Sequence, residues 1–237
     1  MNKHVYESDY SADSLRWLNK IIELNLKPSD HVGLEKFQDE IIVANDTAMA
    51  YFFATEFSYK VWRMQKLILD KKDPKYAFIF ALTVPNADIK ALQNIVADSN
   101  KFKYITKFAC FVKQADRKIL EALIIKSKNV KYAHMYLKHV KGSDTSKFKQ
   151  IIIDSGKPRY LFELAKHLTT DSDIEMIEDL IIKSNSFTYM RLFAEKIKKA
   201  NVEKLEQAVL ATDNGPEIKK FAKYVRKSKM KQFLLVM

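Results

Sequence analysis

The stretch "KYITKFACFVKQAD" at residues 103–116 returns as "KYAHMYLKHVKGSD" at residues 131–144, with its tyrosine, apolar positions and closing aspartate at the same offsets. Further copies keep this register at spacings of 28, 28, 28 and 29 residues. Their marker tyrosines are Tyr76, Tyr104, Tyr132, Tyr160 and Tyr189. A fixed period of this length is typical of repeat proteins, in which each unit packs on its neighbours.

Alignment on these tyrosines defines the repeated units. They occupy residues 61–88, 89–116, 117–144, 145–173, 174–201 and 202–229. A divergent copy at 34–60 keeps Phe53, Ala54 and Phe57 and has Met49 at the tyrosine position. We therefore expect seven units over residues 34–229.

Each unit reads as two short helices, a first helix and a second helix. Apolar residues recur every three or four positions, which is the period of a helix with one buried face. In one first helix they are Leu92, Ile95 and Val96, and in the following second helix they are Tyr104, Ile105, Phe108, Ala109 and Val112. The tyrosines are in phase with this apolar stripe. We therefore interpret them as core residues whose hydroxyls reach the edge of the stripe, rather than as exposed platforms for stacked bases.

Capping residues mark the predicted helix starts. A short polar residue directly before a first helix can accept hydrogen bonds from its unpaired backbone N–H groups. The predicted caps are Asp88, Asp116, Asp144, Asp173 and Asn201. The pair Asp73–Pro74 gives the same signal for a second helix, with proline at the first helical position.

These patterns predict an all-α fold, an α-solenoid of about seven antiparallel helix pairs with an N-terminal cap helix at 11–26. Residues 1–33 are the cap helix and linker, and residues 34–229 are the repeats. Residues 230–237 form an apolar C-terminal end of the same domain.

The charge of the chain is positive and unevenly distributed. The net charge is +12, with 6 Lys/Arg against 10 Asp/Glu in residues 1–60 and 35 against 19 in the rest. A positive field favours acidic protein surfaces, nucleic acid or anionic lipid. The single cysteine, Cys110, excludes an intramolecular disulfide, and no apolar run approaches the roughly 20 residues of a membrane span. We expect a cytoplasmic protein with no membrane association.

Motifs of catalysis and cofactor binding do not occur in the sequence. It contains no P-loop, dinucleotide-binding glycine pattern, HExxH, CxxC or nucleophile elbow. His139 and His167 fall at equivalent positions of adjacent units, and His134 precedes His139, but no third ligand accompanies them. We therefore expect solvated histidines, no metal, no cofactor, no small-molecule substrate and no enzymatic activity.

Basic residues at equivalent positions are the most informative polar feature. Lys75, Lys103, Lys131 and Arg159 stand directly before a marker tyrosine. Further along the second helices come Lys138, Lys166 and Lys223, and at the helix ends Lys113, Lys141, Lys198 and Arg226. Stacking would align them as a face for an anionic partner. The alternative is that lysine only keeps exposed helix faces solvated.

The C-terminal stretch "IKKFAKYVRKSKMKQ" at 218–232 concentrates this charge. It contains Lys219, Lys220, Lys223, Arg226 and Lys227, interleaved with Phe221 and Tyr224. Such a pattern suits nucleic acid, and it equally suits a polar capping repeat.

The stretches "YAFIFALTVPNADIKALQ" (76–93), "IIKSKNVKY" (124–132) and "FAEKIKKANVEKLEQAVL" (193–210) resemble the short two-helix tandem repeats of large-phage and giant-virus proteins. In outline the array is also similar to HEAT-type repeats, which are longer. The resemblance implies a binding scaffold, a viral or phage factor that acts on a host component. The leading hypothesis is a non-enzymatic scaffold for a protein with an acidic surface, and the alternative is a DNA- or RNA-binding protein.

Overall fold

The computed structural model describes residues 19–141, 144–225 and 228–229. Their regular secondary structure is helical, and no strand occurs among them, which confirms the prediction of an all-α protein. None of the helices in these ranges has the length and apolarity needed to cross a membrane. The predicted apolar end at 230–237 lies outside the described residues.

The predicted N-terminal cap helix is described only in part. Residues 19–23 are helical and are followed by a turn, whereas residues 11–18 lie outside the described ranges. Helix α2 begins at His31, three residues before the predicted start of the repeats at 34. Asp30 sets this start, because its side chain accepts a hydrogen bond from the Gly33 amide at 2.9 Å.

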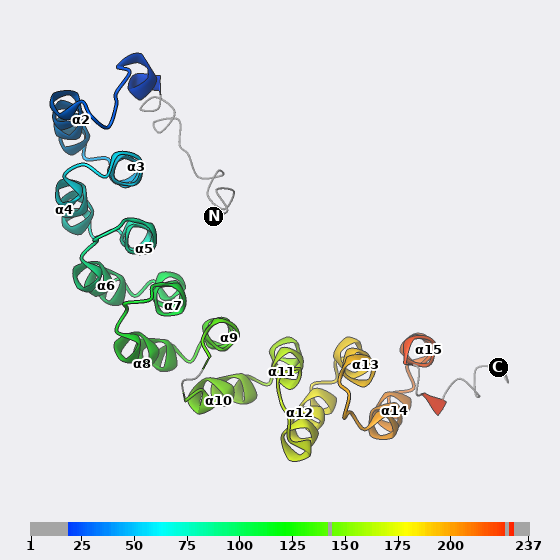
Figure 1. Cartoon of the computed structure of the whole chain (residues 1–237). Coiled ribbons are helices and arrows are strands. Elements are labelled where there is room, and N and C mark those ends of the chain that lie inside the picture. The colour runs from blue at the N-terminus through cyan, green and yellow to red at the C-terminus, as the bar shows by residue number, and fades with distance from the viewer. Residues whose placement is uncertain (1–18, 142–143, 226–227, 230–237) are drawn as a thin grey trace. The chain divides into compact units, whose positions relative to one another are not determined.

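The chain divides into two compact units, Met1–Ile124 and Ile125–Met237. Unit 1 contains α2 (His31–Ala44), α3 (Thr47–Phe57), α4 (Val61–Lys71), α5 (Pro74–Thr83), α6 (Ile89–Asp98) and α7 (Phe102–Phe111). Helix α8 (Arg117–Ser127) spans the boundary. Figure 1 shows the first helices α2, α4 and α6 in one row and the second helices α3, α5 and α7 in another.

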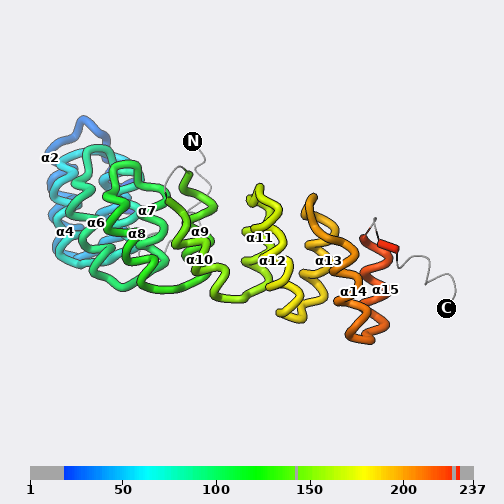
Figure 2. The backbone as a smooth tube through the Cα atoms, turned by 90° about the horizontal axis from the view of Figure 1, so that it is seen from below, coloured from blue at the N-terminus to red at the C-terminus, as the bar shows by residue number. Residues whose placement is uncertain are grey.

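Unit 2 repeats this arrangement. It contains α9 (Val130–His139), α10 (Ser146–Ser155), α11 (Pro158–Ala165), α12 (Asp171–Lys183), α13 (Phe187–Lys196), α14 (Val202–Leu210) and α15 (Gly215–Tyr224). The second helices α9, α11, α13 and α15 contact one another in order. Helices α10, α12 and α14 pack beside them, as the tube in Figure 2 shows.

The core follows the predicted stripe, with one correction. At one equivalent position each second helix buries a large residue and, in all but one of them, an alanine next to it. The large residues are Phe53, Phe80, Phe108, Tyr136, Leu164, Phe193 and Phe221, and the alanines are Ala54, Ala81, Ala109, Ala165, Ala194 and Ala222. The marker tyrosines Tyr76, Tyr104, Tyr132, Tyr160 and Tyr189 are only half-buried. They reach the edge of the stripe, as predicted for their hydroxyls, but their rings are less deeply buried than those of core residues such as Phe108.

Most predicted caps are confirmed. The side chains of Asp88 and Asn201 accept from backbone amides of α6 and α14 at 3.0 and 3.1 Å, and Asp73 accepts from the Lys75 amide at 2.7 Å. Asp116, directly before α8, likewise accepts from the Lys118 amide. The prediction at Asp144 is wrong by one residue, because α10 begins at Ser146 and has Thr145 as its N-cap, although Asp144 accepts from the Ser146 amide.

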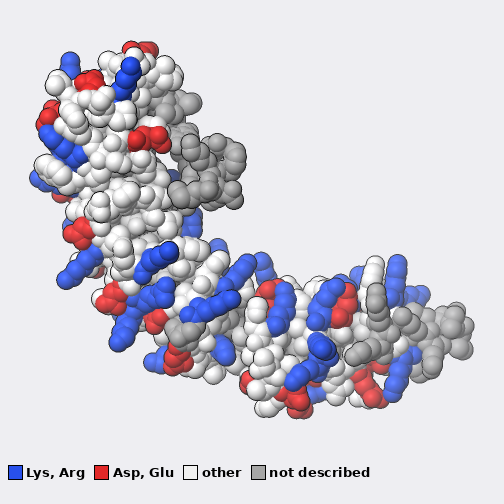
Figure 3. Space-filling model, in the orientation of Figure 1, with Lys and Arg blue, Asp and Glu red and all other residues white. Residues whose placement is uncertain are grey.

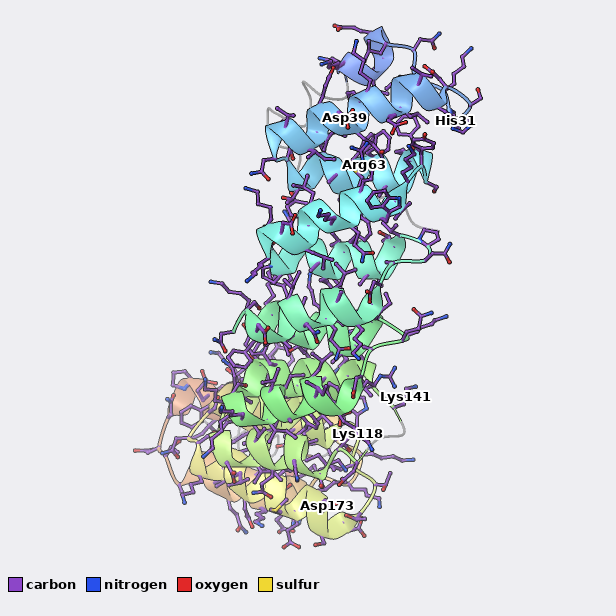
Figure 4. The ribbon with its side chains drawn as sticks, turned by 90° about the vertical axis from the view of Figure 1, so that its left-hand side faces the viewer. His31, Asp39, Arg63, Lys118, Lys141 and Asp173 are labelled. Atoms are coloured by element: carbon purple, nitrogen blue, oxygen red, sulfur yellow. The ribbon has the colours of Figure 1, made fainter. Side chains whose placement is uncertain are left out.

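The predicted cap at Asp173 is wrong. Helix α12 begins at Asp171, and Thr170 is its N-cap, accepting from the Asp173 amide at 3.2 Å. Asp173, labelled in Figure 4, therefore lies inside the first turn of this helix. Carboxylates in a first turn interact favourably with the helix dipole, so an earlier start makes use of both Asp171 and Asp173.

A row of buried polar side chains links successive first helices. Gln65 on α4 accepts from the Asp88 amide at 2.9 Å, and Gln93 on α6 accepts from the Asp116 amide at 2.8 Å. Both glutamines are at most 8% exposed, and each bonds to the residue just before the next first helix. Gln38 on α2 is fully buried and donates to the Tyr59 carbonyl at 2.7 Å. Buried amides of this kind stabilise the turn because they satisfy backbone groups that water does not reach.

In unit 2, glutamate occupies this position on α12 and α14. Glu178 on α12 is 2% exposed and accepts from the Asn201 amide at 2.8 Å. Glu206 on α14 is 5% exposed and accepts a hydrogen bond from the Ser228 hydroxyl. Burial raises the pKa of Glu178 above its ordinary value, and the hydrogen bond from Asn201 and the charge of Lys204 oppose this shift.

Ion pairs on the outer surface add to the links between first helices. Arg63 on α4 reaches Asp39 on α2 at 2.5 Å and donates to the Gln38 side chain at 3.4 Å (Figure 4). Asp39 is more than half exposed, so the pair contributes on the order of 1 kcal/mol or less.

Candidate functional site

The basic residues before the marker tyrosines occupy one structural position. Lys75, Lys103, Lys131 and Arg159 are each the second residue of a second helix, on α5, α7, α9 and α11 respectively. The caps fix the backbone there, because Asp73 and Asn129 accept from the amides of Lys75 and Lys131 at 2.7 and 3.0 Å. We call these four side chains the first-turn basic residues.

Three of these cations lie close to the tyrosine that follows them. The Nζ atoms of Lys75 and Lys103 are 5.3 and 5.5 Å from the ring centroids of Tyr76 and Tyr104. The guanidinium carbon of Arg159 is 5.9 Å from the Tyr160 centroid. These distances are within the range of cation–π attraction, so each cation and its half-buried ring form one surface feature.

The first-turn basic residues stand where the helix itself disfavours them. The N-terminus of a helix carries partial positive charge, so a cation in the first turn is unfavourable and a carboxylate is favourable. No acidic residue occupies the first turn of α5, α7, α9 or α11. The first turns of α4, α6, α8 and α10 also lack an acidic residue, whereas α12, α14 and α15 each have at least one. Lys90, Lys118 and Lys147 hold the same second position on α6, α8 and α10. Because glutamate at these positions would be solvated and would also stabilise the helix, each cation there forgoes a favourable interaction with the helix dipole.

Other predicted binding residues are partly neutralised. Lys166 pairs with Glu163 at 2.7 Å and lies 4.8 Å from the Phe162 ring centroid. Lys220 pairs with Glu217 at 2.7 Å. Lys138 and Lys219 are exposed. Over the face of unit 2 in Figure 3, acidic side chains lie among the basic ones, so the positive surface is interrupted there.

The C-terminal stretch differs from its predicted arrangement. Phe221 is buried in the core at 1% exposure, whereas Tyr224 is 49% exposed. Lys223 and Arg191 lie 5.4 and 5.0 Å from the Tyr224 ring centroid. Only one of the two interleaved aromatic residues is therefore available to a ligand. Arg226 and Lys227 lie outside the described residues.

The structure groups the histidines differently from the sequence expectation. The rings of His134 on α9 and Tyr160 on α11 are 5.3 Å apart. Burial lowers the pKa of His134, and nearby Glu163 opposes this effect. His139 and His167 are exposed. The described residues include no cluster of three or more His, Cys, Asp or Glu able to hold a metal ion.

Cys110 on α7 is half-buried, as predicted for a small apolar residue. Burial raises the pKa of its thiol to about 12, and the charge of Arg117 opposes this rise. The thiolate is the reactive form of cysteine, so the side chain is unreactive at neutral pH.

Comparison with known proteins finds no matching family model, no matching curated protein and no matching solved structure. The resemblance to phage and giant-virus repeats therefore stays a prediction. Function is inferred from the chemistry of the described residues.

Proposed function

We propose that the protein is a non-enzymatic α-helical repeat scaffold, a solenoid of about seven helix pairs, that binds a partner with an acidic surface. The observation that carries this proposal is the position of the first-turn basic residues. Each lies in the first turn of a second helix, beside a half-buried tyrosine and without a first-turn acid.

The energetics of the helix N-terminus support an anionic partner. A cation in a first turn forgoes the roughly 0.3–1 kcal/mol that a carboxylate would gain there. A carboxylate supplied by a partner would interact favourably with both the cation and the helix dipole. The cost to the free protein is thus offset in the complex, which is the behaviour of a binding residue.

An acidic protein suits the surface better than a nucleic acid does. Acidic residues such as Glu163 and Glu217 lie among the cations of the second helices. They would repel a continuous phosphate backbone, whereas a protein surface of mixed charge can complement both signs. The resemblance to phage and giant-virus repeats is the reason to seek this partner among cytoplasmic host proteins.

Nucleic-acid binding is the second candidate, and the half-buried tyrosines favour it. Tyr104 and Tyr160 each lie beside a cation and keep part of the ring accessible. Aromatic rings next to basic side chains are the usual contacts for single-stranded nucleic acid.

Charge reversal of Lys103, Lys131 and Arg159 to glutamate tests the proposal. The measurement is capture of a partner from host lysate, with and without nuclease. The wild type should capture the partner under both conditions, and the charge-reversed variant should capture it under neither. The matched control reverses Lys66, Lys90 and Lys126, which are exposed on the first helices α4, α6 and α8. Equal capture by both variants would contradict the proposal.

The salt dependence of binding separates the two candidates. If nucleic acid is the ligand, nuclease should abolish capture, and log affinity should fall with log salt by about 0.7–0.9 per phosphate neutralised. Because glutamate suits a helix N-terminus, the reversed variant should be at least as stable as the wild type in chemical denaturation. Lost capture would then report binding rather than unfolding.

A further inference from the structure

A groove of about 470 Å³ in unit 2 lies between the C-terminal ends of α13 and α15 and the start of α14. Lys196 and Lys198 line it on one side, with Ala200 and Val202 along the connection to α14. Tyr224, on the last turn of α15, lines the opposite side and is 49% exposed. The groove therefore has an apolar wall, an aromatic ring and a basic rim.

Unit 1 has a groove at the equivalent place, with different chemistry. It measures about 460 Å³ and lies between the C-terminal ends of α5 and α7. Thr83, Pro85 and Phe111 stand where the groove of unit 2 has Lys196, Lys198 and Tyr224. The shape recurs with the repeat, but the lining of the groove in unit 1 includes one basic residue, Lys113, whereas that of unit 2 includes Lys196 and Lys198. The groove in unit 2 is therefore distinguished by its second lysine and by the two cations beside Tyr224.

The charge around the groove of unit 2 is strongly positive. Arg191 lies 5.0 Å and Lys223 lies 5.4 Å from the centroid of the Tyr224 ring. Glu195 is the acidic residue in the lining and pairs with Arg191 at 3.2 Å and with Lys196 at 2.8 Å. The lining thus contains two lysines and one glutamate, Arg191 and Lys223 lie beside Tyr224, and Lys198 and Lys223 are exposed.

We propose that this groove binds an acidic peptide segment of the partner, with one aromatic or large apolar side chain between its carboxylates. This inference rests on the proposed function and names its ligand. The apolar side chain would pack on Tyr224, Ala200 and Val202, and the flanking carboxylates would contact Lys196, Lys198 and Lys223.

A peptide suits the groove better than a free phosphate or a nucleic acid. The apolar wall offers nothing to a phosphate, whereas it would bury a side chain of the peptide. Glu195 lies on the rim and would repel a phosphate chain passing over it. An acidic peptide can place a neutral residue there.

Fluorescence anisotropy with a fluorescein-labelled peptide, in which a central phenylalanine is flanked by glutamates, tests the inference. Two comparison peptides replace the glutamates by glutamine or the phenylalanine by glycine, and an oligothymidylate of equal charge provides the phosphate arm. The double variant Lys196→Glu, Lys198→Glu and the single variant Tyr224→Ala should each weaken binding of the acidic peptide by about tenfold.

Matched controls come from unit 1. Phe111→Ala, and separately Lys113→Glu with Lys118→Glu, should leave peptide binding within about twofold of the wild type. Equal binding by wild type and groove variants would overturn the inference. The absence of binding at about 1 mM peptide, or tighter binding of the oligothymidylate, would also overturn it.

The two proposals fail in different ways. The groove inference would be wrong, and the proposed function would stand, if partner capture is normal in the groove variants but is abolished by reversal of Lys103, Lys131 and Arg159. Loss of capture in the groove variants, with normal capture by the triple reversal, would contradict the role of the first-turn basic residues and support the groove.

Discussion

The two units share one plan but differ in what they bury at equivalent positions. Unit 1 buries the neutral amides Gln38, Gln65 and Gln93 on its first helices, and unit 2 buries the carboxylates Glu178 and Glu206. Among the large residues of the second helices, unit 1 uses phenylalanine throughout, and unit 2 includes Tyr136. The hydrogen bond from the amide before the next first helix is therefore accepted by a neutral side chain at Gln65 and Gln93 and by an ionisable one at Glu178. A repeat conserves the geometry of a contact more strictly than its charge.

The largest effect is expected in the core of unit 2. Tyr136 is fully buried and stacks on Phe148 with ring centroids 4.3 Å apart. Tyr136→Ala should lower the free energy of unfolding by about 3–5 kcal/mol, as for other buried aromatic truncations. Chemical denaturation measures this loss.

The half-buried Tyr132 provides the control for this prediction. Tyr132→Ala should cost less than half as much as Tyr136→Ala, because Tyr132 lies at the edge of the stripe. Equal losses at the two positions would contradict the difference in burial.

The next effect concerns the amide of unit 1. Gln93 accepts from the Asp116 amide at 2.8 Å and donates to its carbonyl at 3.4 Å. Gln93→Leu should lower the free energy of unfolding by about 2 kcal/mol, because both backbone groups lose a partner. Gln114→Leu, at an exposed position, should change it by less than about 0.5 kcal/mol. A Gln93 variant as stable as the Gln114 variant would show that water replaces the amide.

A smaller effect of opposite sign is expected at Glu178. Its pKa is raised in the folded state, so its contribution to stability is full below the ordinary value of 4.5 and is lost as the pH rises through the raised value. Glu178→Gln keeps the acceptor for Asn201 and removes the buried charge. It should raise the free energy of unfolding by about 1 kcal/mol at pH 7 and leave it unchanged near pH 4.

Urea denaturation across this pH range measures the Glu178 effect. Glu175→Gln, an exposed change on the same helix that is also near Lys204, is the matched control and should have little effect at either pH. A gain at pH 4 as large as that at pH 7 would exclude ionisation as its cause.

The smallest effect is expected where the row of buried polar residues is interrupted. Lys149 occupies this position on α10 and is exposed. Lys149→Gln should change the free energy of unfolding by less than about 0.5 kcal/mol. Gln65 and Gln93 each bond to the residue 23 positions further along, which lies just before a helix. For Lys149 that residue is Ser172, which already lies within α12, so a glutamine at position 149 would have no equivalent backbone group to bond. A gain comparable to the loss in the Gln93 variant would contradict this explanation.

Helical periodicity predicted the elements well and the depth of burial less well. The starts of α4, α6, α8 and α14 follow from the tyrosine register, and the alanines beside the large core residues are buried as expected. The rings of the marker tyrosines lie nearer the edge of the apolar stripe than predicted, because helical periodicity alone does not separate the centre of a stripe from its edge. On α5, for example, Ala77 and Phe80 are the fully buried residues, and Tyr76 beside them is half-buried.

The row of buried glutamines and glutamates was missed although its period was present in the sequence. Gln65 and Gln93 are 28 residues apart, like the tyrosines. A search for apolar stripes assigns a polar residue to the surface, so the signal lay in the self-comparison rather than in hydrophobicity. The first-turn basic residues were predicted by register, but their unfavourable position in the helix required the observed helix starts.

The short reach of the glutamine contacts has a consequence for folding kinetics. Gln93 bonds to Asp116, only 23 residues further along the chain, and Gln65 bonds to Asp88 at the same separation. Native contacts of such small sequence separation require little loop closure before they form, and proteins rich in them fold within microseconds to milliseconds. Each of these hydrogen bonds can therefore form as soon as the next helix has been synthesised, before the distant end of the chain is made.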